Sequence, residues 1–85
     1  MVDNPTTEQI NAHFSAMDDS VDLIDSVIAG EHDALATQTT EEVKEMVTRN
    51  TDHLELQLDK DWATNDNRDK TSYTDAITAG KNYVG

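Results

Sequence analysis

Three histidines and four serines are the residues of this 85-residue chain that could serve in acid-base or nucleophilic catalysis, because the chain has no cysteine. They are His13, His32, His53, Ser15, Ser20, Ser26 and Ser72. A serine nucleophile needs a base and an orienting group within hydrogen-bond reach. None of the four serines lies in a recognised nucleophile motif. No two histidines stand four residues apart, the spacing of a helical zinc-ligand pair. The sequence therefore predicts a protein without enzymatic activity and without a cofactor.

Acidic and amide side chains between Asp59 and Asp69 are dense enough to compare with a calcium-binding loop. An EF-hand loop requires glycine at its sixth position and a bidentate glutamate at its twelfth. Counted from Asp59, these positions hold Thr64 and Lys70. The sequence therefore predicts no metal site in this segment, and we interpret it as a loop rich in turn-forming residues.

A second acidic group, Asp18, Asp22 and Asp25, has the three- and four-residue spacing that places side chains on one side of a helix. A solvated helix face explains this spacing, and so does a docking ridge for lysine and arginine side chains of a partner. Apolar and aromatic residues beyond the needs of a small core are further candidates for partner contact. The candidate partner-binding residues are Asp18, Asp22, Asp25, Leu23, Val27, Trp62, Tyr73 and Tyr83. Leu23, Val27, Leu35 and Leu56 are expected to be exposed.

Negative charge is concentrated in the first half of the chain. The net charge is −12, from 18 acidic and 6 basic residues, and every basic residue lies at or after Lys44. Because binding to phosphates depends on lysine and arginine, this charge disfavours nucleic acid and anionic membranes as direct partners. A basic protein surface is the natural complement, although the acidic residues also provide solubility. No segment approaches the roughly 18 apolar residues of a membrane span, and we expect no secretory signal.

Helix signals occur three times along the chain. Residues 1–5, ending at Pro5, are expected to form an extended arm. Thr6 with Gln9, and Thr39 with Glu42, have the spacing of a capping box, and Gly30 suits a helix C-cap. Apolar residues at three- and four-residue intervals then predict helices at about 7–29, 40–62 and 69–84.

These three segments predict an all-α fold in which residues 6–85 form a single domain. The arrangement is a small three-helix bundle or a helical hairpin plus a C-terminal helix. The third segment has a narrow apolar face with small residues at Ala76, Ala79 and Gly80, where another helix could approach closely. Only 53–58 alternates apolar and polar residues as a strand would, and the surrounding helical periodicity favours a helix there.

The segment Val-Thr-Arg-Asn-Thr-Asp-His-Leu, followed by Ala-Ile-Thr-Ala-Gly-Lys-Asn-Tyr-Val near the end of the chain, resembles small acidic helical proteins encoded by marine bacteriophages. In that group an Arg-Asn-x-x-His-Leu segment precedes an acidic turn and an Ala-Ile-x-x-Gly-x-x-Tyr ending. The resemblance covers Arg49 to Val84, about half of the chain. It implies a phage origin but no mechanism.

The first functional hypothesis is therefore a non-enzymatic virion accessory protein, such as a capsid-decoration, neck or tail-associated subunit. It would bind other virion subunits through helix faces, and it would be located in the virion, or in the host cytoplasm during assembly. The alternative is a nucleic-acid mimic or other acidic inhibitor that blocks a basic surface of a host factor. A third hypothesis is an acidic helical domain that forms a homo-oligomer through Ala76 and Gly80.

Overall fold

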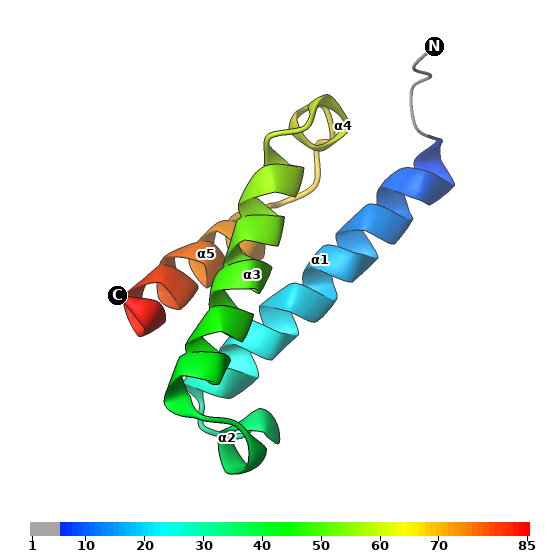
Figure 1. Ribbon diagram of the computed structural model, residues 1–85. Helices are drawn as coiled ribbons and strands as arrows, with labels where there is room; N and C mark the ends of the chain where they lie inside the picture. Colours follow the sequence, from blue (N-terminus) through cyan, green and yellow to red (C-terminus); the bar gives the residue numbers. More distant parts are fainter. Residues whose placement is uncertain (1–5) are drawn as a thin grey trace.

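The computed structural model describes residues 6–85, and the predicted N-terminal arm at residues 1–5 lies outside them. The described residues form five helices and no strand, which confirms the all-α prediction. The helices are α1 (Thr7–Ile28), α2 (Ala34–Thr37), α3 (Thr40–Leu58), α4 (Asp61–Thr64) and α5 (Thr71–Val84). The long helices α1, α3 and α5 pack on one another as a three-helix bundle, with α2 and α4 at opposite ends (Figure 1).

Capping boxes start the two longest helices, as predicted from the sequence. At α1 the Thr6 hydroxyl accepts a hydrogen bond of 3.1 Å from the Gln9 amide, and the Gln9 side chain accepts one of 2.9 Å from the Thr6 amide. Thr39 and Glu42 repeat this pair at the start of α3. Each box satisfies two amides that have no partner inside the helix.

Gly30 ends α1, as predicted, in a left-handed conformation with a φ of +79°. Its amide donates to the Val27 carbonyl, and the next amide, of Glu31, donates to the Ser26 carbonyl. This pair of bonds is a Schellman motif, and the positive φ suits glycine because it has no Cβ. The motif turns the chain towards α2, whose Ala34 is buried against the bundle.

The predicted helix at 40–62 is wrong at its C-terminal end. Helix α3 stops at Leu58, Lys60 is extended with a ψ of 149°, and Asp61–Thr64 form the separate helix α4. The break allows Trp62 to reach α1, where its ring stacks on His13 at 4.6 Å and meets the edge of Phe14 at 5.4 Å. Tertiary contact with α1 therefore overrides the helical periodicity that continues to Trp62.

Helix α5 packs against α3 at its small residues. Gly80 is buried, and a Cβ added to it would lie closer to the Thr51 hydroxyl oxygen than van der Waals contact allows. Ala76 is also buried. The close approach predicted for this face is therefore real, but it occurs within one chain. The hypothesis that Ala76 and Gly80 join two copies of the protein is wrong for the folded chain, because α3 already covers this face.

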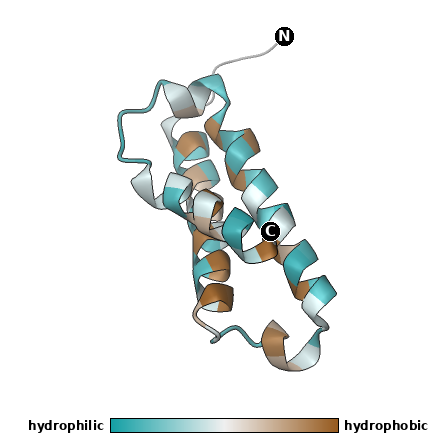
Figure 2. Cartoon of the chain, turned by 90° about the vertical axis from the view of Figure 1, so that its left-hand side faces the viewer, coloured by the Kyte–Doolittle hydropathy of each residue, from teal (hydrophilic) through white to brown (hydrophobic). Residues whose placement is uncertain are grey.

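The core runs between the three long helices and is fully apolar except for two small polar residues. Its buried apolar members are Phe14, Met17, Ile24, Val27, Ala34, Val43, Val47, Leu54, Ala63, Tyr73 and Ala76. The polar members are Ser20 and Thr51, and the Thr51 hydroxyl donates 2.8 Å to the Val47 carbonyl one turn earlier. Apolar residues recur every three to four positions among polar ones along the long helices, seen as separate brown and teal stretches in Figure 2, so one side of each helix can be buried.

Candidate protein-binding surface

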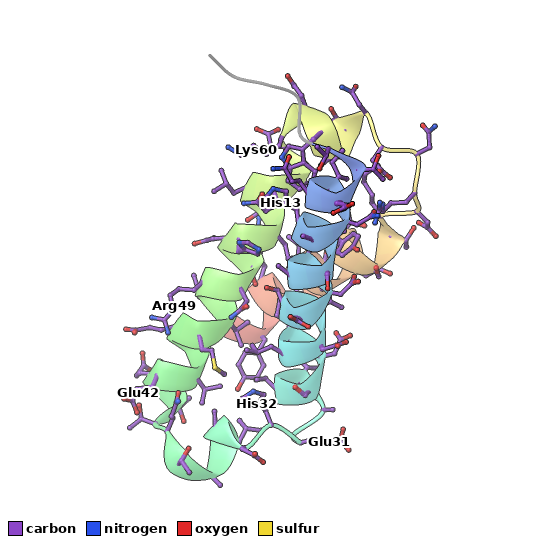
Figure 3. All side chains as sticks on the ribbon, turned by 90° about the vertical axis from the view of Figure 1, so that its right-hand side faces the viewer. His13, Glu31, His32, Glu42, Arg49 and Lys60 are labelled. Carbon is purple, nitrogen blue, oxygen red and sulfur yellow. The ribbon has the colours of Figure 1, made fainter. Side chains whose placement is uncertain are left out.

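The residues with catalytic potential do not converge in the described part of the chain. His13 lies near the α4 end of α1, whereas His32 follows the opposite end (Figure 3). The His32 ring accepts a hydrogen bond of 3.1 Å from the Ala34 amide, so it supports the turn into α2. Among residues 6–85, no three His, Asp or Glu side chains are grouped closely enough to hold a metal ion.

The connection between α4 and α5 is fixed to α1 by a charged and aromatic cluster. The Arg68 guanidinium lies 3.9 Å from the centre of the Phe14 ring and donates 2.8 Å to the Asn11 side chain. It also donates 2.8 Å to the Asp66 carboxylate. This arrangement combines a cation–π contact with a charge-assisted hydrogen bond. Arg68 therefore acts as a structural anchor for the loop.

Ionisation in this cluster follows from its hydrogen bonds. The side-chain bond from Arg68 lowers the pKa of Asp66, and the same bond raises the pKa of Arg68. Hydrogen bonds from the Thr71 hydroxyl and amide lower the pKa of Asp69. Burial, followed by a 2.7 Å hydrogen bond to Asp18, raises the pKa of Tyr73 to about 12. Tyr73 therefore stays a neutral donor at ordinary pH.

The predicted acidic ridge on α1 is exposed, although its three members differ. Asp18, Asp22 and Asp25 are all on the surface. Asp18 accepts the hydrogen bond from the Tyr73 hydroxyl, so part of its capacity is used within the chain. No such contact to another helix involves Asp22 or Asp25 in residues 6–85. These two carboxylates are the part of the ridge that is open to a partner.

Two of the predicted partner-binding residues belong to the core. Val27 is 2% exposed and Tyr73 is 4% exposed, so the prediction of an exposed Val27 and of a partner contact at Tyr73 is wrong. The Tyr73 ring of α5 packs against the Phe14 ring of α1, with 5.6 Å between the ring centres, so α5 covers a face that the sequence suggested was free. Leu23, Trp62 and Tyr83 are half-buried at the edge of the core.

Large apolar side chains remain exposed at three separate places. Leu56 on α3 is 58% exposed, Ile28 at the end of α1 is 45% exposed, and Leu35 on α2 is 38% exposed. Exposure of Leu35 and Leu56 confirms the prediction for these two residues. Ile28 is exposed, whereas the preceding residue, Val27, is buried in the core.

Shallow open grooves accompany two of these residues. One, of about 640 Å³, is lined by Asp52, Glu55, Leu56, Leu58, Asp59 and Ile77. We call it the α3/α5 groove. Another, of about 390 Å³, is lined by Ile28, Ala79, Asn82 and Tyr83 between the ends of α1 and α5. The α3/α5 groove was not predicted, although the spacing of Asp52, Leu56 and Asp59 already placed them on one side of a helix.

The fold and these surfaces define a small all-α three-helix bundle with shallow, partly apolar grooves on its outer faces. No helix in the described range has the length and apolar character needed to pass through a membrane. No family model, curated protein or solved structure matches the chain.

Proposed function

We propose that this protein is a non-enzymatic accessory subunit of a phage particle, a capsid-decoration, neck or tail-associated component that binds neighbouring proteins through its helix faces. The observation that carries the binding role is the 58% exposure of Leu56 within a groove. Isolated apolar residues on a surface are ordinary, but Leu56 shares its groove with Leu58 and Ile77 among acidic residues, and this grouping supports a contact site. The phage setting rests on the resemblance of Arg49 to Val84 to marine phage proteins.

The shape of the grooves supports a protein partner over a small molecule. Sites for small ligands are concave and cover most of the ligand surface. The grooves at Leu56 and at Ile28 are instead open and shallow. A helix or loop of another protein can cover such a surface without being enclosed.

Mass spectrometry of purified particles tests the proposed function. We expect the chain to be present in the particle, and chemical cross-linking should join Lys44, Lys60 or Lys81 to a neighbouring subunit. A chain that is synthesised during infection but is absent from purified particles would refute the virion role.

Charge mimicry is the second candidate, and a specific observation favours it. Helix α1 carries the exposed residues Asp19, Asp22 and Asp25 and has no lysine or arginine along its 22 residues. Carboxylates along a helix can imitate phosphates and occupy a basic groove of a host factor. Such binding weakens with salt, because screening at ~1 M salt extends only ~3 Å. A host partner retained with unchanged affinity at that salt concentration excludes mimicry.

A further inference from the structure

We propose that the α3/α5 groove is the docking site for a basic amphipathic helix of a partner protein, with an apolar side chain on Leu56 and Ile77 and lysine or arginine on the surrounding carboxylates. This inference rests on the proposed function and deepens it, because it names the surface and the chemistry of the partner.

Leu56 lies at the centre of a helix face with acidic neighbours. Asp52 is one turn before Leu56, Glu55 precedes it directly, and Asp59 is three residues after it. Side chains three or four residues apart are neighbours on a helix surface, so Asp52 and Asp59 lie beside Leu56 on α3. All four line the groove together with Leu58 and Ile77, so the apolar floor has carboxylates along its α3 side.

The lining of the groove contains three acidic residues and no basic residue. Lys81 on α5, beside the groove, donates 2.7 Å to Glu55. Both side chains of this pair are exposed, at 57% and 42%, so it is a weak surface interaction that a partner can replace. Asp52 and Asp59 are exposed and have no side-chain bond to another helix in residues 6–85. Two of the three carboxylates of the groove, those of Asp52 and Asp59, are therefore free of such a pair and lie around an apolar centre.

Charge excludes a second copy of the protein as the preferred occupant. The chain carries a net charge of −12, so a self-association through this face would bring like charges together. A helix with an apolar ridge between lysine or arginine residues can pack on the apolar side chains of the groove and pair with its carboxylates. Helices of this kind bind grooves through apolar anchors at three- and four-residue intervals.

A defined peptide tests the site directly. The probe is a fluorescently labelled helical peptide with leucine at three- and four-residue intervals and lysine at the other positions. Its controls are a peptide with the same composition in scrambled order and one with glutamate in place of lysine. We expect fluorescence anisotropy to show binding of the first peptide only, with affinity that falls as salt is raised.

Matched variants locate the binding. Leu56→Ser should lower the affinity for the peptide about tenfold, equal to about 1.4 kcal/mol. Leu35→Ser, at an exposed leucine on α2, should leave the affinity unchanged. The double variant Asp52→Asn with Asp59→Asn should lower the affinity for the peptide about three- to tenfold. Asp22→Asn with Asp25→Asn removes the same charge from α1 and should have less effect.

Nuclear magnetic resonance locates the peptide-binding site independently. Amide shifts in the protein are expected to change around residues 52–59 and 77 when the leucine–lysine peptide is added. Equal weakening by the two double variants, or shifts centred on α1, would overturn the docking site. A chain that is found in particles but does not bind this peptide overturns the groove inference alone. A chain that binds through Leu56 but is absent from particles overturns the virion role alone.

Discussion

Replacing Gly80 with alanine tests the closest contact between α3 and α5. A Cβ at this position would overlap the Thr51 hydroxyl oxygen, whose bond to the Val47 carbonyl holds it in place. The next atoms, a Val47 methyl at 3.4 Å and the Thr51 Cβ at 3.6 Å, leave ordinary contact distances. The obstacle to a methyl group at Gly80 is therefore a single oxygen atom.

The expected change in stability is the difference between two opposing effects. Overpacking in a well-packed core costs ~1–3 kcal/mol. Alanine favours the helix over glycine by ~1 kcal/mol. Gly80→Ala should therefore lower the free energy of unfolding by about 1 kcal/mol, which corresponds to a melting temperature lower by about 4–8 °C in a domain of this size.

Removing the oxygen should reverse the sign of the effect. In a Thr51→Ala background the obstacle is absent, and Gly80→Ala should then raise the free energy of unfolding by up to ~1 kcal/mol through helix propensity. The interaction energy between the two positions is then about 2 kcal/mol. In a Thr51→Ser background the oxygen remains, so Gly80→Ala should still destabilise the protein.

Urea unfolding followed by far-ultraviolet circular dichroism measures these differences. The control is that the unfolding slope stays the same in all variants, so that the compactness of the two states is unchanged. The reasoning is refuted if Gly80→Ala stabilises the chain with Thr51 present, or if its effect is the same with alanine or threonine at position 51.

Three further predictions concern the loop between α4 and α5 and the first turn of α5. Arg68→Lys should lower the free energy of unfolding by about 0.5–1 kcal/mol, because lysine lacks the planar group that both covers Phe14 and bonds Asn11; a urea midpoint equal to that of the unchanged chain would contradict this. The raised pKa of Tyr73, about 12 against ~10 when unfolded, favours its neutral form in the folded protein. The stability gained is complete below about pH 10 and is lost as pH rises towards about 12, so Tyr73→Phe should flatten the unfolding free energy across this range. The lowered pKa of Asp66 gives stability that is present above about pH 4 and is lost as pH falls through the folded pKa. Asp66→Asn should therefore reduce the loss of melting temperature in acid, and an unchanged acid profile would exclude the Arg68 bond as its cause.

Local sequence signals predicted most of the fold. Each capping box and Gly30 acts through bonds within a few residues, so the pattern contains nearly all of the information that these boundaries need. The break at Lys60 had no such signal. It depends on contacts of Trp62 with His13 and Phe14, which are almost fifty residues away in the chain.

The binding surface was harder to predict, because it depends on which side of each helix faces its neighbours. Val27 and Ile28 are adjacent and equally apolar, and only the position of the other helices decides that Val27 is buried. Likewise, of the adjacent polar residues Asn50 and Thr51, Thr51 lies in the core beside Gly80 and Asn50 is only partly buried. Leu56 was predicted to be exposed, but the contribution of Ile77 to its groove required the packing of α5.

In residues 6–85, the side-chain hydrogen bonds that join α1, α3, α5 and the loop between α4 and α5 to one another involve α1 no further than Asp18 and α3 no earlier than Glu55. They connect Arg68 to Asn11, Tyr73 to Asp18, and Lys81 to Glu55. Beyond Asp18 on α1 and before Glu55 on α3, the long helices are held together by apolar contact, which is not directional. Local unfolding is therefore expected to begin at the α2 end, and amide hydrogens there should exchange with solvent faster than those near α4.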